Sequence, residues 1–512
     1  MDASPKQTIQ LDGDSLSLAE LEAVALGKAR VAPAAAALRR MEESLEAARR
    51  FAEGTEPAYG INTGFGRLAE VRITPEDAAA LQANVVRSHA AGVGAPLDEA
   101  ASRALLLLRA NVLLKGYSGV RPLIVERLCS LLNSGAYPLI PSKGSVGASG
   151  DLAPLAHVAL LLMGEGEGFI DGVRLPGAMV LFRLQMKPLE LGPKEGLALV
   201  NGTQAMTACG ALDLLRAERL VETAEVAGAL TLEALRGSRQ AFRAELHDLR
   251  PHPGQLASAR RLWELLEESE IMESHRDCGK VQDAYSLRCM PQVHGAVRDT
   301  LSHARRVLEI ELNSATDNPL VFAGADPDRP DGAAVISGGN FHGAPVAYVL
   351  DFMSIALTDL AAISERRIER TVNPDLSDLP PFLAANPGLE SGLMMAQVTA
   401  AALVSGCKAL AHPASVDSIP TSANKEDHVS MGMTAALKLR EILEDAERVL
   451  AIELLCASRA LRFLEPLKPA RPLQPHLAAV RHAVPPAQGD RSPSRDIERV
   501  ASMVRCGKFA KS

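Results

Sequence analysis

Aromatic side chains are scarce in this chain, where Phe, Trp and Tyr together make up 3% of the residues. Alanine and leucine supply most of the 47% that are apolar, and this composition favours helices over strands. The basic excess that nucleic-acid-coating proteins normally show is also absent, because the net charge is -8. The composition therefore predicts a mainly α protein that does not bind nucleic acid.

Cysteines are few, seven in 512 residues, and none form a CxxC pair. An odd number in so long a chain argues against a disulfide framework or a zinc ribbon, and we expect no metal. The N-terminus lacks the basic and apolar regions of a secretory signal. The longest apolar run, residues 152–163, is too short to span a bilayer. We therefore expect a soluble, cytoplasmic protein without a membrane segment.

Helical periodicity dominates the chain. In the N-terminal half a short strand pattern lies near residues 168–175, and helical patterns cover residues 18–31, 34–51, 75–91, 98–114 and 122–132. Longer helical patterns cover residues 204–236, 282–312, 341–370, 388–410 and 425–461. Lengths above about 25 residues are typical of helix bundles. We therefore expect a loop-rich N-terminal region, residues 1–200, and a long-helix bundle with C-terminal helices, residues 201–512.

The segment GSVGASGDLAPLAH, residues 144–157, is the most unusual local pattern. Its composition fits a flexible connector, but it lacks the GxxxxGK[ST] pattern of a phosphate loop and the GxSxG pattern of a hydrolase elbow. A further interpretation is chemical. The small residues Ala148 and Gly150 allow the amide nitrogen of Gly150 to approach the carbonyl of Ala148. Loss of two waters, one of them from Ser149, would then leave 4-methylidene-imidazol-5-one (MIO), an electrophile.

The residues that follow this tripeptide fit the start of a helix. Asp151 is suited to the N-cap and Pro154 to the first turn. The positive end of such a helix would point at the ring and favour electron density there.

This segment resembles the signature of the MIO-dependent ammonia-lyases and aminomutases. Other segments resemble motifs of the same family in the same order: YGINTGFG at 59–66, SHAAGVG at 88–94, NGTQ at 201–204, QDAYSLRC at 282–289, NSATDNP at 313–319, GNFHG at 339–343 and SIPTSANKEDHVSMG at 418–432. Together they span most of the chain. SHA and KEDHVSMG are most similar to the histidine branch of the family.

The resemblance implies a carbon–nitrogen lyase that converts L-histidine to trans-urocanate and ammonia, the first step of histidine degradation. It implies MIO formed from Ala148, Ser149 and Gly150, with no metal and no nucleotide. It also implies a homotetramer whose active sites are shared between subunits, and a single catalytic unit made from both regions of the chain.

Three residues have implied roles in proton removal and ring recognition. Tyr59 alone would be a packing residue, since a phenol with a pKa of about 10 is a poor base without nearby positive charge; the resemblance makes it the base for the β-proton. His89, otherwise structural, would hydrogen-bond the substrate ring, as it also does in tyrosine-specific relatives. Without the resemblance, Glu426 would be interpreted as a residue at a helix N-terminus or as a metal ligand. The resemblance implies that it binds the imidazole of the substrate. Lys425 departs from the glutamine expected there, and its charge would keep Glu426 ionised.

The remaining site residues have weaker signals of their own. Asn201 fits an N-cap, and the resemblance adds a hydrogen bond to the ring or the substrate amine. On a helix, Gln282 and Tyr285 would lie on one face and Arg288 slightly to its side. Without the resemblance, these three polar residues would be interpreted as a solvent-exposed stripe. The resemblance implies that Gln282 binds substrate, that Tyr285 acts near the reacting carbon, and that Arg288 grips the carboxylate. Phe341, otherwise a core aromatic, would pack beside the ring.

Other functions stay open at this stage. A tyrosine or phenylalanine ammonia-lyase, or a 2,3-aminomutase, would use the same scaffold with few changed residues. A non-catalytic helical scaffold would be expected to have lost Tyr59 or the tripeptide, and both are present. The helical fumarase-like lyases would carry a GSSxMPxK-type loop, which the sequence lacks.

Overall fold

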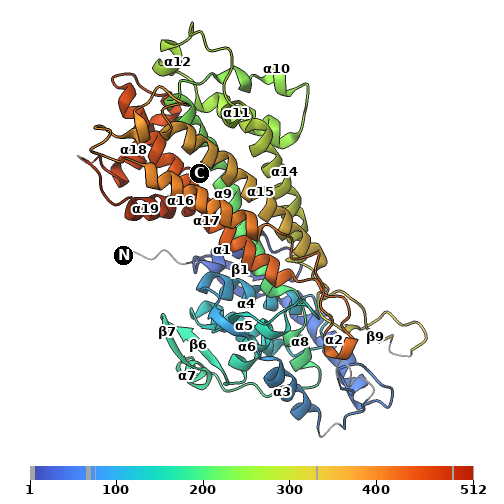
Figure 1. Cartoon of the computed structure of the whole chain (residues 1–512). Coiled ribbons are helices and arrows are strands. Elements are labelled where there is room, and N and C mark those ends of the chain that lie inside the picture. The colour runs from blue at the N-terminus through green and yellow to red at the C-terminus, as the bar shows by residue number, and fades with distance from the viewer. Residues whose placement is uncertain (1–5, 65–70, 75–76, 330–331, 487–488, 511–512) are drawn as a thin grey trace. The chain divides into compact units, whose positions relative to one another are not determined.

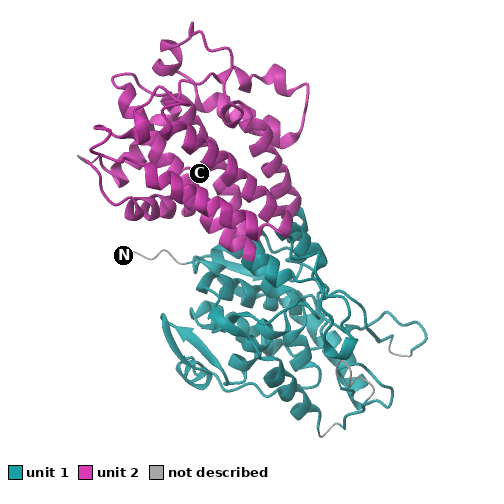
Figure 2. Cartoon of the chain, viewed as in Figure 1, with its two compact units in different colours: residues 1–212, 306–350, 413–437 teal, residues 213–305, 351–412, 438–512 magenta. Residues whose placement is uncertain are grey.

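Figure 1 shows a computed structural model of the chain, which describes residues 6–64, 71–74, 77–329, 332–486 and 489–510. The chain forms two compact units (Figure 2). Unit 1 comprises residues 1–212, 306–350 and 413–437, and unit 2 comprises residues 213–305, 351–412 and 438–512. Both units are mainly helical, which confirms the predicted fold class. The expected boundary at residue 200, between the loop-rich N-terminal region and the long-helix bundle, stays a prediction.

The helices of unit 1 surround one almost completely buried helix, α4 (Glu99–Leu114). Its apolar sequence on nearly all faces explains this position, because no face favours water. It packs against α1 (Leu18–Ala25) and α5 (Pro122–Asn133). The other helices of this unit are α2 (Ala35–Glu53), α3 (Ala78–His89), α6 (Leu152–Leu162), α7 (Gly177–Arg183) and α8 (Glu195–Val200).

Short strands hold the loops of unit 1 together. One pair is parallel, β1 (Thr8–Leu11) with β2 (Arg30–Pro33). Two antiparallel pairs are β3 (Val93–Pro96) with β5 (Pro141–Lys143) and β8 (Leu320–Phe322) with β9 (Ala334–Ile336). A third, antiparallel sheet joins β4 (Tyr137–Pro138) to β6 (Glu167–Ile170) and β6 to β7 (Val173–Pro176). The strand expected near 168–175 is therefore a hairpin. Asp171 and Gly172 form its turn with φ of 53° and 74°, as a tight hairpin turn requires.

Unit 2 contains most residues of the long helices. These are α9 (Gln204–Ala234), α14 (Met290–Glu311), α15 (Ala344–Val372), α16 (Met394–Leu410) and α17 (Gly432–Ala460). A buried ion pair joins α15 to α17, where Arg367 Nε lies 2.5 Å from Glu453 Oε1. Thr231 of α9 donates a hydrogen bond to the same carboxylate at 3.0 Å. Three long helices thus meet at one buried charge.

Shorter helices complete the described fold. They are η2 (Arg239–Phe242), α10 (Ala244–His247), α11 (Pro253–Leu265), α12 (Glu270–Ser274), α13 (Tyr285–Arg288), η3 (Pro381–Leu383), η4 (Ser422–Asn424), η5 (Leu461–Leu464), η6 (Arg471–Leu473), α18 (Gln474–Ala483) and α19 (Ser494–Arg505).

Several predicted helix boundaries are wrong for local reasons. The helix predicted at 18–31 ends at Ala25, because residues 30–33 pair with β1 instead. The helix predicted at 282–312 begins in full only at Met290, since Pro291 fits a first turn and not an interior. The helix predicted from residue 425 begins at Gly432, and that predicted from 388 begins at Met394.

Within the described residues, α15 is the one helix long and apolar enough to cross a membrane by length and composition. However, 56% of the relevant stretch is buried inside the protein, and a core helix of a soluble protein passes the same test.

Candidate active site

The loop that precedes α6, residues 144–151 and called the Gly/Ser loop below, has a strained backbone at the tripeptide. Ser149 has φ of 48° and Gly150 has φ of 80°, both in the left-handed region that L-residues other than glycine rarely adopt. A Cβ on Gly150 would lie 2.2 Å from the carbonyl oxygen of Gly202, so only glycine fits there. The Gly150 amide donates to the carbonyl of Gly147 at 3.4 Å, which closes a tight turn around Ala148 and Ser149.

Two backbone hydrogen bonds from Gly202 flank Gly150. The amide of Gly202 donates to the carbonyl oxygen of Ser149 at 3.1 Å, and its carbonyl accepts from the amide of Asp151 at 2.7 Å. We call this pair of bonds the Gly202 clasp. A fixed donor therefore stands at the Ser149 oxygen, where it would stabilise negative charge as an oxyanion-hole donor does.

Asp151 connects the loop to a second helix. It precedes α6 as expected, but its side chain makes no capping bond to that helix, so this part of the prediction is wrong. Its carboxylate instead accepts from the amide of Met206 in the first turn of α9 at 2.8 Å. Asp151 is fully buried, and burial raises the pKa of its carboxyl to about 7. Two helices, α6 and α9, therefore have their N-termini beside the tripeptide.

The segment around residue 430 packs directly on the loop, and the segment around residue 343 packs on residue 430. A Cβ on Gly147 would lie 2.1 Å from Ser430 Oγ, and a Cβ on Gly343 would lie 3.1 Å from the same atom. The amide of Met431 donates to the carbonyl of Val146 at 2.9 Å. Unit 1 thus brings together three motifs that are spread over almost 300 residues of the sequence.

Tyr59 is half-buried in a turn that a buried glutamine fixes. Gln82 donates to the carbonyl of Gly60 at 3.4 Å, and its side-chain oxygen accepts from the amide of Leu197 at 3.0 Å. Gln82 lies on α3 and Leu197 on α8, so the turn is tied to both helices. Tyr59 also lines a cavity of about 520 Å³ whose wall includes Arg329. Residues 65 and 66 of its motif lie outside the described residues.

His89 is the last residue of α3 and is half-buried. Its Nδ1 lies 2.8 Å from the carbonyl oxygen of Val85, so a neutral ring that donates there keeps Nε2 as an acceptor. Three residues later, a Cβ on Gly92 would lie 3.0 Å from His157 Nε2 of α6. The Cα of Gly92 also lies 3.1 Å from the Cβ position of Gly144, which places this segment against the Gly/Ser loop.

Asn201 ends α8 and does not cap α9, so the N-cap interpretation is wrong. Its side chain is buried and its Nδ2 donates to the carbonyl of Asn318 at 2.8 Å. Phe341 is half-buried just before α15. The neighbouring His342 ring stacks on His428, with centroids 5.8 Å apart and planes at 4°.

Glu426 lies in a tight loop and not on a helix. Its carboxylate accepts from Thr421 Oγ1 at 2.7 Å, and the backbones of the two residues pair in both directions. Between them, Ser422, Ala423 and Asn424 all have positive φ. Within the described residues no ion pair joins Lys425 to Glu426, so the threonine fixes this carboxylate.

The other three predicted residues belong to unit 2. Gln282 precedes α13 and is not helical, which makes the predicted shared helix face wrong. Tyr285 is 72% exposed, and Arg288 lies over its ring with Cζ 4.5 Å from the centroid. Arg288 Nε donates to the carbonyl of Asp283 at 3.1 Å, and no carboxylate among the described residues pairs with it. Eight of the predicted residues therefore belong to unit 1, and these three belong to unit 2.

Sequence reasoning missed a buried polar network beneath the loop. Lys194 Nζ lies 2.6 Å from Asp317 Oδ2, and both side chains are fully buried. Arg109 of α4 is fully buried beside it and donates to backbone carbonyls. The signal was the pair of arginines, Arg103 and Arg109, within SRALLLLRANVLL (residues 102–114), since a charge in so apolar a helix needs buried partners. Among the described residues, no group of three or more His, Cys, Asp or Glu is placed to hold a metal.

The fold and this site define an aromatic amino acid lyase: the model of that family matches residues 16–482, and the chain belongs to it. It is a carbon–nitrogen lyase by that membership. Among its relatives, the histidine ammonia-lyase of Stigmatella aurantiaca is 54% identical over 98% of this chain and 97% of its own length.

Solved structures agree with this assignment. Histidine ammonia-lyase from Trypanosoma cruzi superposes with a TM-score of 0.90 at 42% identity, over 98% of this chain and 94% of that one. Tyrosine aminomutase from Streptomyces globisporus superposes with a TM-score of 0.92 at 41% identity, over 98% and 97%.

Proposed function

We propose that this chain is a histidine ammonia-lyase, which eliminates ammonia from L-histidine to give trans-urocanate. The single observation that carries the proposal is the strained tripeptide held by the Gly202 clasp, with the fixed carboxylate of Glu426 in the same unit. The similarity to histidine ammonia-lyases over almost the whole chain supports the choice of substrate.

We infer that Ala148, Ser149 and Gly150 form MIO. The chain's own geometry fits this group: Gly150 has no room for a Cβ, Ser149 has a left-handed backbone, and the Ser149 oxygen already has a fixed donor. Once formed, the ring supplies an electrophilic carbon that takes up the substrate amine and makes it a better leaving group. The amide of Gly202 and the starts of α6 and α9 stabilise negative charge at the Ser149 oxygen.

The remaining residues bind and orient histidine. Glu426 accepts a hydrogen bond from the imidazole N–H, and His89 helps to orient the same ring. Tyr59 removes the β-proton, and such a base typically contributes about 10²–10⁴-fold to rate. Asn201 and Phe341 hold the substrate amine and ring.

Gln282, Tyr285 and Arg288 complete the site: Arg288 binds the carboxylate, Gln282 binds the substrate, and Tyr285 acts near the reacting carbon. The exposure of Tyr285 and the unpaired charge of Arg288 among the described residues suit a contact with another molecule. We propose that a neighbouring subunit of a homotetramer supplies them, so that the active sites are shared and both regions of the chain form one catalytic unit. Arg288 is suited to bidentate carboxylate binding by its planar guanidinium.

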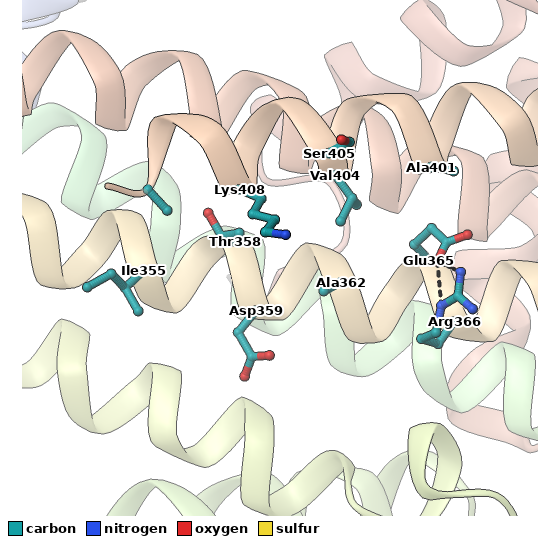
Figure 3. Close-up of a pocket in the computed structure, with 11 residues that line it drawn as sticks. Ile355, Thr358, Asp359, Ala362, Glu365, Arg366, Ala401, Val404, Ser405 and Lys408 are labelled. Atoms are coloured by element: carbon teal, nitrogen blue, oxygen red, sulfur yellow. Dashed lines mark hydrogen bonds and ion pairs between the residues drawn. The ribbon is translucent and has the colours of Figure 1, made fainter. Parts of the chain in front are cut away.

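An exposed apolar face supports assembly with further copies of this chain. On α15 and α16, Tyr348, Phe352, Ile355, Met395 and Val398 are between 45% and 59% exposed. A groove of about 520 Å³ runs between these helices. Figure 3 shows it with Ile355 and Asp359 on α15 and Lys408 on α16. Large exposed apolar patches mark interaction sites. The exposed apolar face of α15 and α16 is therefore suited to packing against a helix of another copy of this chain.

The oligomer is testable by light scattering after size exclusion. Ile355→Glu, which puts a charge on this face, is expected to yield smaller assemblies, whereas Leu249→Glu is a control at a residue already 86% exposed. A parent chain that runs as a monomer would contradict the shared site. We further propose a cytoplasmic location, consistent with the seven free cysteines.

The deciding experiment offers purified protein L-histidine, L-tyrosine and L-phenylalanine and identifies the products by chromatography and absorbance. Urocanate from histidine is expected. An unsaturated acid from tyrosine or phenylalanine alone would instead favour an ammonia-lyase for that substrate. A β-amino acid would favour an aminomutase, an alternative supported by the 41% identity to tyrosine aminomutase. No product together with an intact mass that lacks the two-water deficit would indicate a non-catalytic scaffold. Ser149→Ala, which cannot form the ring, is the matched negative control.

A further inference from the structure

Arg109 is a buried cation that the proposed chemistry leaves without a role. Its side chain is fully buried, and burial lowers the pKa of the guanidinium to about 10, so it is charged at neutral pH. Charged side chains are almost never fully buried unless they are paired. Among the described residues, however, no carboxylate forms an ion pair with Arg109. Its hydrogen-bond acceptors are uncharged oxygens.

Those acceptors lie at the junction of two helices. Arg109 donates through Nη1 to the carbonyl of Ala198 at 2.8 Å and through Nη2 to the carbonyl of Asn201 at 2.5 Å. Nη2 also donates to the side-chain oxygen of Gln204. Ala198 and Asn201 lie at the C-terminal end of α8, where carbonyls lack helical partners and carry partial negative charge. Gln204 begins α9, so one guanidinium joins the end of α8 to the start of α9.

Gly202 lies inside this junction. Its φ of 127° is available only to glycine, and a Cβ there would lie 2.9 Å from Arg109 Nη2. The guanidinium therefore occupies the space that a side chain at Gly202 would need on one side. On the other side, the same residue makes the two clasp bonds to Ser149 and Asp151. Arg109 and the two clasp bonds therefore meet at one glycine.

We propose that Arg109 is a positioning residue for ring closure, which holds Gly202 so that the clasp keeps the tripeptide in its compressed conformation. In that closure the Gly150 nitrogen bonds to the Ala148 carbonyl carbon, and the carbonyl oxygen leaves as water with the amide protons of Gly150 and Ser149, so that a C=N bond forms to the Ser149 nitrogen. The Ser149 hydroxyl leaves with the Cα proton as a second water, so no oxidant is needed. This inference rests on the proposed function, because it assumes that the ring forms at this tripeptide.

Arg103 offers a matched control on the same helix. It is also buried, and it also donates to carbonyls at helix ends, those of Val24, Ala25 and Leu132. None of these residues belongs to the Gly/Ser loop or the Gly202 clasp. Replacing Arg103 therefore removes the same kind of buried bonds without disturbing the clasp.

The test compares the parent, Arg109→Met, Arg109→Lys and Arg103→Met by intact mass, immediately after identical short expression and purification. Loss of a hydrogen bond to a charged group should slow ring closure about tenfold or more. We expect most Arg109→Met chains to lack the two-water deficit, and Arg109→Lys to be intermediate because its single ammonium cannot reach all three acceptors. Arg103→Met should match the parent. Circular dichroism checks that each variant is helical.

The outcomes separate the inference from the proposed function. A parent without the mass deficit overturns the proposed function itself. A parent with the deficit and an Arg109→Met variant that is equally complete overturns the role of Arg109. Equal losses in Arg109→Met and Arg103→Met would also overturn it, since they would reflect general destabilisation. If Arg109→Met does not fold, Arg109→Lys carries the same comparison.

Discussion

The hydrogen bond between Thr421 and Glu426 gives a direct test of how the substrate ring is recognised. Thr421→Val removes the hydroxyl that donates to Glu426 Oε2 at 2.7 Å and keeps the shape of the side chain. Bonds to charged groups contribute about 1.5–3 kcal/mol. Because Glu426 is only half-buried, water replaces part of the lost bond. We therefore expect a loss of about 1 kcal/mol in binding of the transition state, or about fivefold in kcat/KM for histidine.

The assay is steady-state kinetics of urocanate formation, with Thr421→Ser as the control that keeps the hydroxyl. Glu426→Gln should cost more, since it removes the charge itself. Thr421→Val added to Glu426→Gln should then change little, because both act through one carboxylate. An unchanged kcat/KM in Thr421→Val, or full additivity of the two changes, would refute this account of the loop.

Three further outcomes follow from other parts of the structure. Gly202→Ala should leave the tripeptide unreacted by intact mass, because alanine cannot adopt a φ of 127° without strain; a normal mass deficit would contradict this. Glu453→Gln should destabilise the fold by about 3–5 kcal/mol in denaturant titrations by leaving Arg367 buried and unpaired. The surface change Glu498→Gln should cost at most about 1 kcal/mol, and equal effects of the two would count against the reasoning. The carboxyl of Asp151 has a pKa raised from 3.8 to about 7, so the folded chain holds this proton more tightly than the unfolded chain; stability should fall as pH rises between these values, and Asp151→Asn should reduce that fall.

The tripeptide and the buried helix were readable from sequence because their signals are local. Three adjacent small residues predict the strained turn at Ser149, and apolar residues on every face predict the burial of α4. The start of α14 was also available in principle, since Pro291 cannot occupy a helix interior. The roles assigned to the eleven site residues depend on the resemblance and stay predictions.

What could not be read from sequence depends on distant partners. The carboxylate of Asp151 is adjacent to α6 but bonds to α9, 55 residues later. The loop of Glu426 is fixed by Thr421 through a backbone pairing that no periodicity reveals. Gln282 fits a helical pattern, yet it lies outside the helix that the flanking residues form. Periodicity detects a face, but it does not tell which side chains meet across the fold.

The Gly202 clasp has a consequence for anyone who wishes to move this chemistry into another protein. The segment 144–157 carries the atoms that react, but the bonds that hold them come from Gly202, about fifty residues away. The residue before that glycine, Asn201, is bound by Arg109 of α4. Grafted alone into a foreign scaffold, those fourteen residues would be an ordinary turn. A designed protein would therefore need the junction of α8 and α9 with Gly202 and Arg109 as well as the segment 144–157. A fragment that holds the segment without this junction is not expected to form the ring.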